Sequence, residues 1–420
     1  MSHPLDDLVR AQKRGEYRGL PSICSAHPRV LKVALRGSGP VLIESTCNQV
    51  NQFGGYTGMT PSDFVAFVKK IASENGFPPE RILLGGDHLG PSPWQAEPAQ
   101  SAMEKAAGMV RSYMRAGFTK IHLDASMRLG DDPPGTLDPL ISAHRTAELA
   151  CLAEESRLDS GPAPRYVIGT EVPLPGGARE HTHVDVTSLE AARGTMEVMQ
   201  AAFKKLGLES AWKRVVAMVV QPGVEFGDGF ITHYLPTAAH TLACFSETTP
   251  FVFEAHSTDY QSRLNLRDLV RGHFAILKVG PALTFAYREA VFALAEIEAA
   301  LFGVGQRSEL VEVLEHVMLR HPQHWQDYYR GTPDEQAFAR KFSLSDRIRY
   351  YWSYPEVRAA LGKLFSNLEG VDIPVSLFRQ AAPRLFKRIQ TKKNVNCSAE
   401  LVDASIQAVL DDYRIACTPT

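Results

Sequence analysis

The sequence predicts an α/β protein, a (β/α)8 TIM barrel followed by a helical extension. Eight short apolar runs alternate with amphipathic helical patterns between about residues 21 and 303 of the 420-residue chain. After residue 303 the strand rhythm stops, while helical and aromatic-rich segments continue to the end. We therefore expect a catalytic barrel domain over residues 1–303 and a helical C-terminal extension over residues 304–420, packed on the barrel.

The eight expected strands are strongly apolar, often β-branched and short, as is typical of strands buried on both faces. They lie at 23–26, 41–46, 82–87, 120–126, 166–172, 214–221, 251–257 and 274–280. A doubly wound open sheet is the alternative fold. It is disfavoured because no Gly-x-Gly-x-x-Gly motif follows the first strand.

The helices between these strands have recognisable ends. Thr60, Pro61 and Asp63 provide an N-cap, a proline in the first turn and an acidic residue, and Gly76 can end that helix. An apolar stripe between them faces the core. Comparable patterns fit 28–36, 98–116, 138–156, 188–205, 236–246, 262–272 and 284–301.

Composition excludes several classes of protein. Lys plus Arg is 45 and Asp plus Glu is 47, a formal net charge of −2, so no basic nucleic-acid surface is expected. No apolar run is long enough for a membrane span, and the charged N-terminus has no signal-peptide core. Six scattered cysteines without a Cys-x-x-Cys pair predict reduced thiols and a cytoplasmic protein.

Ionisable and polar residues occur where the strands end, which is where active sites of this fold lie. A buried charge is costly unless it is paired or binds a ligand. A strand-end residue on almost every strand therefore predicts one catalytic ring. Its members are Glu44, Asp87, His88, His122, Asp124, Glu171, Gln221, Glu254, His256 and Lys278.

The mixture of histidines and carboxylates in this ring suits a divalent metal such as zinc. We expect His88, Glu171 and His256, from three different strands, to be its ligands. His181 and His183, in the loop after the fifth strand, are reserve ligands. In the alternative interpretation, His256 and its neighbour Glu254 only hydrogen-bond to the backbone.

Three carboxylates are catalytic candidates: Asp87, Asp124 and Glu254. Asp87 directly precedes His88, and the turn at a strand end can bring both side chains to the site. A carboxylate beside a metal can move protons on a sugar hydroxyl. Asp87 or Asp124 could instead only orient a ligand histidine.

Substrate binding is expected from the loops after the last two strands, the common phosphate position of this fold. Ser257 lies in the first loop, and Gly280 precedes a helix that offers free N–H groups. Lys278 could contact the phosphate or pair with a ring carboxylate.

Other polar residues complete the expected substrate site. Asn48 begins an amide-rich loop, whose amides could bind sugar hydroxyls or could only stabilise the loop by internal hydrogen bonds. Glu44 and Gln221, at the ends of their strands, are further candidates for substrate binding. Arg347 and Arg349 could reach a phosphate from the extension, although salt bridges on a helix face are the favoured interpretation.

Long motifs of the chain resemble one family, that of the Z-type subunit of class II D-tagatose-1,6-bisphosphate aldolase. They include GGDHLGP, KIHLDASM, EAHSTDYQ and SLSDRIRYYW, so the resemblance reaches into the extension. The motifs occupy 44–61, 85–91, 120–127, 169–177, 219–226, 254–261, 273–286 and 343–352.

This resemblance implies a role in bacterial tagatose or galactitol catabolism. Some members are described as non-catalytic partners of a Y-type catalytic subunit, and others resemble stand-alone D-tagatose-6-phosphate 4-epimerases. Some relatives are labelled kinases, but this chain has no Gly-rich phosphate loop followed by Lys and Ser or Thr.

The third strand also resembles catalytic class II aldolases, in which an Asp-His pair supplies the acid/base and a zinc ligand. The resemblance thus implies acid/base catalysis by Asp87 and metal binding by His88. Those aldolases complete the site with further histidines, whereas here only His256 stands at a clear strand end.

We therefore expect metal-dependent 4-epimerisation of D-tagatose 6-phosphate to D-fructose 6-phosphate, by breaking and re-forming the C3–C4 bond. The alternative is a non-catalytic Z-type subunit that supports a separate aldolase subunit. In either case the partner molecule is a phosphorylated ketose, and homo-oligomerisation is left open.

Overall fold

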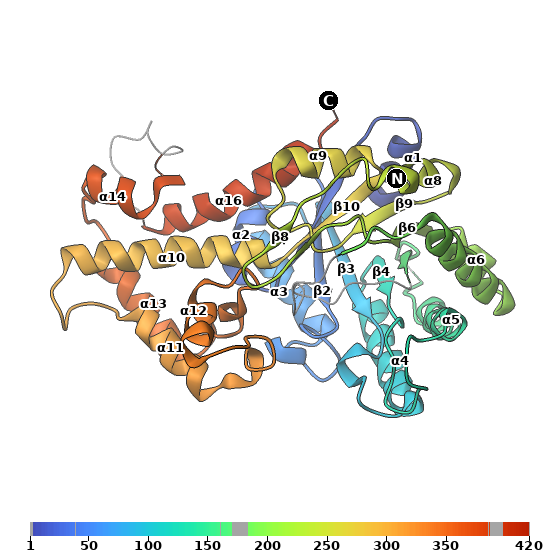
Figure 1. The fold of residues 1–420 in the computed structure, drawn as a ribbon, viewed down its shortest axis with the longest axis horizontal. Coiled ribbons are helices and arrows are strands. Elements are labelled where there is room, and N and C mark those ends of the chain that lie inside the picture. Colours follow the sequence, from blue (N-terminus) through green and yellow to red (C-terminus); the bar gives the residue numbers. More distant parts are fainter. Residues whose placement is uncertain are drawn as a thin grey trace.

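The computed structural model describes residues 3–37, 39–159, 161–169, 184–384, 386 and 398–419. Figure 1 shows a central barrel ringed by helices, with further helices gathered to one side of it. No helix among these residues is long and apolar enough to cross a lipid bilayer.

The barrel consists of eight parallel strands that close on themselves, as the sequence predicts. Its order of neighbours is β1-β10-β9-β6-β5-β4-β3-β2, so an open sheet is excluded. A small antiparallel hairpin, β7 (Glu225–Phe226) with β8 (Ile231–Thr232), lies outside it. The barrel strands are β1 (Leu20–Cys24), β2 (Val41–Thr46), β3 (Ile82–Leu89), β4 (Lys120–Leu123), β5 (Arg165–Ile168), β6 (Val215–Val219), β9 (Val252–Ala255) and β10 (Phe274–Val279).

Every expected helix of the barrel is present. In α3 (Pro61–Glu74), the Thr60 hydroxyl accepts from the Asp63 N–H, and the Asp63 carboxylate accepts from the Thr60 N–H at 3.0 Å. The N-cap at Thr60 is the one that the sequence predicts, and the bond back from Asp63 makes it a reciprocal cap. The other helices are α2 (Pro28–Ala34), α4 (Ala99–Arg115), α5 (Pro139–Glu155), α6 (Leu189–Lys205), α7 (Glu209–Trp212), α8 (His240–Thr248), α9 (Arg263–Arg271) and α10 (Pro281–Leu301).

An N-terminal helix that the sequence analysis missed, α1 (Pro4–Lys13), packs on the barrel. Its Leu5 and Leu8 join a small buried cluster with side chains such as Leu42 and Val216 from inside the barrel. Arg165 at the start of β5 pairs with Asp6 of this helix. Because α1 covers the amino ends of the strands, the carboxyl ends are left to form the site.

The extension is helical, and its last helix returns to the barrel. Helix α16 (Ser398–Cys417) packs against α10, α9 and α2 (Figure 1). The apolar core is continuous across barrel and extension, and the division of the chain at residue 303 stays a prediction. The other elements are α11 (Leu310–Arg320), α12 (Pro333–Phe342), the 3-10 turn η5 (Arg347–Tyr350), α13 (Pro355–Leu368) and α14 (Val375–Ala381).

Candidate functional site

Two lysines and two glutamates form a buried charge network inside the barrel. The Lys120 ammonium lies 2.7 Å from a Glu254 oxygen and also pairs closely with Glu44. The Lys278 ammonium lies 3.0 Å from the second Glu44 oxygen and contacts Asp87. All are almost fully buried. Each charge thus has an opposite charge beside it, the condition under which buried ions are tolerated.

The sequence provides room for this network. Glu44 on β2 lies opposite Gly85 on β3, and a Cβ at Gly85 would come within 2.7 Å of the Glu44 side chain. A larger residue at this position would displace Glu44 from the two lysines. Burial lowers the pKa of Lys278, but Asp87 and other nearby acids outweigh it and raise that pKa well above its ordinary value.

Three histidines meet beside this network. The ring centroids of His88 and His122 are 4.9 Å apart, those of His88 and His256 are 4.8 Å apart, and those of His122 and His256 are 5.3 Å apart. Ligand atoms of these residues and of Asp87 all lie within 4.8 Å of one another. This buried cluster of histidine and aspartate could hold a metal ion.

A carboxylate holds one nitrogen of each ring. His88 Nδ1 lies 2.9 Å from Asp124, His122 Nδ1 lies 2.8 Å from Asp87, and His256 Nε2 lies 3.1 Å from Glu254. Carboxylates of this kind set the orientation of metal-binding histidines.

The remaining ring nitrogens fit a metal ion. Nε2 of His122 is buried and has no hydrogen-bond partner among the described residues. Burial lowers the pKa of His256 to about 3, with a further contribution from Lys278, and burial also lowers that of His122. Neutral imidazoles are the form that binds metals, so the donors fit this group.

A local irregularity brings Asp87 and His88 to the same place. The pairing of β3 with β4 shifts register between Gly86 and Leu89, and His88 has a φ of +50°. Adjacent residues of a regular strand point to opposite faces. The irregularity allows the adjacent side chains of Asp87 and His88 to point into the same site. Strained backbone of this kind is concentrated at functional sites.

The structure therefore brings together much of the expected ring. Asp87, His88, Asp124, Glu254, His256 and Lys278 all contribute to these contacts. Asp124 and Glu254 lie where they orient His88 and His256. Glu171, His181 and His183 fall outside the described residues, so the expected ligand Glu171 stays a prediction.

Two residues have larger roles than the sequence analysis gave them. His122, named only as a strand-end residue, belongs to the candidate metal cluster, and Lys120 was not singled out at all. Their spacing was the available signal, because Lys120, His122 and Asp124 alternate and so share one face of a strand. A lysine within a strand buried on both faces also requires acidic partners.

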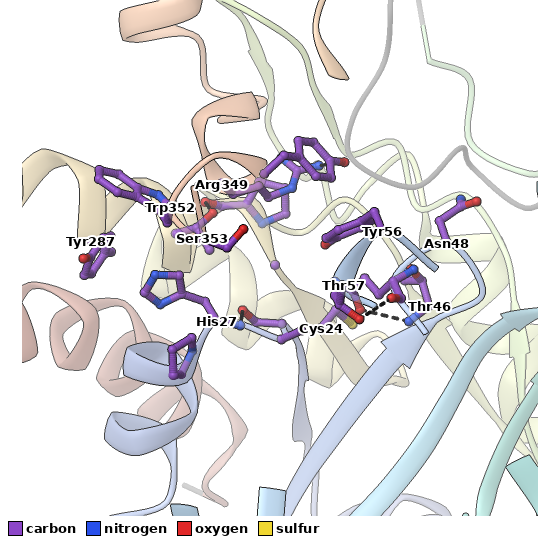
Figure 2. Close-up of a pocket in the computed structure, with 18 of the residues that line it drawn as sticks. Cys24, His27, Thr46, Asn48, Tyr56, Thr57, Tyr287, Arg349, Trp352 and Ser353 are labelled. Atoms are coloured by element: carbon purple, nitrogen blue, oxygen red, sulfur yellow. Dashed lines mark hydrogen bonds between the residues drawn. The ribbon is translucent and has the colours of Figure 1, made fainter. Parts of the chain in front are cut away.

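A cavity of about 1010 Å³ opens above the cluster. Figure 2 shows the carboxyl ends of the barrel strands on one side of it and the extension on the other. Its lining includes seven of the expected substrate-site or cluster residues: Asn48, Asp87, His88, His256, Ser257, Lys278 and Gly280.

Two of the expected substrate residues are engaged in hydrogen bonds within the protein. The side-chain oxygen Oε1 of Gln221 accepts from the N–H groups of Gly223 and Val224, and the Gly280 N–H donates to Asp259 at 3.0 Å. The Ala282 N–H donates to the same Asp259 oxygen at 2.8 Å. Asp259 thus occupies the helix end that the sequence analysis assigned to phosphate, and burial raises its pKa to about 6.

The extension contributes two arginines to the cavity. The sequence analysis favoured helix-face salt bridges for Arg347 and Arg349, and this interpretation is wrong. Within the described residues neither guanidinium lies within 4.0 Å of a carboxylate. Their acidic neighbour Asp346 pairs instead with Arg288 at 3.1 Å. Both arginines line the cavity because the chain turns at Asp346, whose φ is +48°.

Known proteins of similar sequence cover the whole chain. "D-tagatose-1,6-bisphosphate aldolase subunit GatZ" of Salmonella gallinarum is 51% identical over 99% of both chains, and the Klebsiella pneumoniae protein of the same name is 52% identical over the same share. These names favour the subunit function, which the sequence analysis placed second, over the epimerase function.

A solved structure is also similar. The crystal structure of a probable tagatose 6 phosphate kinase from Sinorhizobium meliloti 1021 has a TM-score of 0.87 and 48% identity, and covers 95% of this chain and 100% of its own. The model of the family described as D-tagatose-1,6-bisphosphate aldolase subunit GatZ/KbaZ-like matches residues 5–418. With its barrel, its buried histidine cluster and this match over nearly its full length, the chain belongs to the GatZ/KbaZ-like family.

Proposed function

We propose that this chain is a Z-type subunit of a D-tagatose-1,6-bisphosphate aldolase and works beside a Y-type catalytic subunit. The observation that carries this proposal is the 51% identity over 99% of both chains to a protein with that name. We further propose a cytoplasmic location, which is supported by free thiols at the described cysteines. Homo-oligomerisation is compatible with this role.

A second function is favoured by the ordered charges of the barrel, which a purely supporting subunit does not require. In this proposal the chain itself epimerises D-tagatose 6-phosphate at C4, giving D-fructose 6-phosphate. The C4 hydroxyl loses its proton as the C3–C4 bond breaks and its electron pair passes to C3. The aldehyde then presents its other face, the bond re-forms, and the proton returns to the C4 oxygen.

The residues have separate roles in this proposal. His88, His122 and His256 would hold a divalent metal, with zinc the expected ion, and Glu171 remains a proposed further ligand. When bound, the metal would polarise the substrate carbonyl. Asp87 accepts and returns the proton.

The neighbours of Asp87 support this role. Burial raises the pKa of Asp87, but His88, Lys278 and His122 outweigh it and lower that pKa well below its ordinary value. The carboxylate is therefore ionised, and the Lys278 ammonium in contact with it stabilises that charge.

One experiment separates the two functions. The purified chain is incubated alone with D-tagatose 6-phosphate, with and without a chelator, and the sugar phosphates are followed by NMR. In parallel, a Y-type subunit is assayed on D-tagatose 1,6-bisphosphate with and without this chain. Stimulated aldolase without turnover by the chain alone supports the subunit function, whereas chelator-sensitive formation of D-fructose 6-phosphate supports the epimerase. Neither result would overturn both.

A further inference from the structure

The wall of the cavity that faces the barrel carries two arginines with no carboxylate within 4.0 Å among the described residues. Arg347 and Arg349 lie in the turn η5 of the extension, and Trp352 follows just after it. Figure 2 shows Arg349, Trp352 and Ser353 across the cavity from Cys24 and Thr46 of the barrel. The same cavity reaches Asp87 and His88, so one small molecule can contact both regions.

Two buried donors on this wall have no acceptor among the described residues. They are Nε of Arg347 and the indole Nε1 of Trp352, whose residues are only 3% and 6% exposed. Nδ1 of His27, on the barrel side of the same cavity, also has no partner there. A buried donor without an acceptor costs about 1–3 kcal/mol, so a ligand acceptor at this wall would remove that cost.

The surrounding side chains hold the two guanidiniums in place without neutralising them. The Arg347 guanidinium lies 3.0 Å from the ring centroid of Tyr328 and donates to the His324 carbonyl at 2.8 Å. The Arg349 guanidinium donates to the Tyr350 hydroxyl at 2.9 Å.

The positive field of these groups is evident at Tyr350. Burial raises the pKa of this phenol, but Arg349 and Arg347 outweigh it and lower that pKa below its ordinary value. The acidic residue at the start of the turn, Asp346, pairs with Arg288 at 3.1 Å and interacts with Arg349 only at longer range. This arrangement favours a bound anion, for which Arg offers a planar set of donors.

The usual phosphate position of this fold is closed in this chain. The carboxylate of Asp259 accepts from the N–H groups of Gly280 and Ala282 at the start of α10. A phosphate placed there would have to displace that carboxylate.

We propose that Arg347, Arg349 and the indole N–H of Trp352 bind the phosphate group of a ketose phosphate whose reacting carbons face the histidine cluster. This inference rests on the proposed function for its substrate class. It assigns the extension a direct part in substrate recognition, since every member of this phosphate site lies beyond residue 303.

Three variants test the site. Arg347→Gln and Arg349→Gln remove a charge each, and Trp352→Phe removes the N–H but keeps a ring beside Tyr287, whose centroid lies 4.9 Å away. Arg320→Gln is the control, because Arg320 belongs to an exposed salt bridge with Glu356. Calorimetry measures the Kd of D-tagatose 6-phosphate, of D-tagatose and of inorganic phosphate for each protein, and thermal unfolding confirms that each variant folds.

We expect Arg347→Gln and Arg349→Gln to raise the Kd of D-tagatose 6-phosphate about 10–100-fold, and Trp352→Phe to raise it about 5–10-fold. These three variants should keep the wild-type Kd for D-tagatose and the wild-type metal content. The Arg320→Gln control should keep the wild-type Kd values. Equal losses for the phosphorylated and unphosphorylated sugars, or unchanged Kd values, would overturn the phosphate site. So would a wild-type chain that binds neither D-tagatose 6-phosphate nor inorganic phosphate.

The outcome also distinguishes this inference from the proposed function. Arginine-dependent binding of inorganic phosphate without binding of tagatose phosphate would retain the anion site and remove the substrate assignment. Arginine-dependent binding of D-tagatose 6-phosphate without turnover, alone or with a Y-type subunit, would retain the site while the proposed function fails.

Discussion

The barrel and the extension contribute charge to the same cavity in opposite ways. In the barrel, Lys120 and Lys278 face Glu44, Glu254 and Asp87, so that each buried charge has a partner. In the extension, the arginines of η5 have no carboxylate within 4.0 Å among the described residues. Paired charges fix the geometry of a site before a ligand binds, whereas donors without acceptors favour the binding of an anion. Under our proposals, the barrel therefore fixes the reaction geometry and the extension recognises the anion.

Removing one charged side chain of the barrel network should have the largest effect, a loss of folding stability. Lys120→Met leaves Glu44 and Glu254 buried without this cation, and breaking a buried pair costs about 3–5 kcal/mol. Chemical denaturation should show that loss in the free energy of unfolding. Lys105→Met, which removes a partly exposed pair with Glu97, is the control and should cost far less. Equal costs would show that the barrel network has no special role in stability.

The next largest effect concerns Asp87. Asp87→Asn keeps the size of the side chain but removes the proposed proton acceptor, so kcat should fall about 10²–10⁴-fold. The assay is the one that detects activity, either epimerisation by the chain alone or stimulated aldolase. Metal content and circular dichroism should match the wild type. Full turnover by the variant would remove Asp87 from the mechanism.

A smaller effect is expected from the residues that orient histidines. Asp124→Asn should weaken metal binding about 10–100-fold, because Asp124 holds Nδ1 of His88. His122→Ala should lower the metal content at least as much, since it removes a ligand. Metal analysis after dialysis measures both, and His144→Ala, at an exposed position, is the control. Unchanged metal in His122→Ala would exclude His122 as a ligand.

The last prediction is a pH dependence of stability at the boundary of the two regions. Burial raises the pKa of Asp259 to about 6 from the ordinary 3.8, with Glu225 and Arg349 nearby. The folded state therefore holds this proton more tightly, so the contribution of Asp259 to stability is greatest below pH 3.8 and falls as pH rises to about 6.

Asp259→Asn should remove the loss of stability that Asp259 causes as pH rises. The variant should gain stability relative to wild type between pH 4 and pH 7, by at most ~3 kcal/mol. The gain should be smaller than this limit because the new amide N–H₂ group needs an acceptor. Denaturation curves across this range measure the difference, and a constant difference at every pH would contradict the assignment.

Local sequence patterns were sufficient to predict the barrel and part of its candidate site. Strands such as 41–46 and 274–280 were recognisable because both faces are buried. Helix α1 was missed because its apolar residues are few and lie among charges. The alternation of Lys120, His122 and Asp124 was present in the sequence, yet the partners of Lys120 come from β2 and β9.

The sequence by itself determined the fold class, the carboxyl ends of the strands as the place of the candidate site, and the presence of Asp87, His88 and His256 there. These follow from short-range periodicity and from the position of active sites in this fold. Only the tertiary structure decided which carboxylate holds each histidine, that Asp259 occupies the start of α10, and that Arg347 and Arg349 face the cavity. Such pairings depend on distances between residues far apart in the chain, and local spacing carries no information about them.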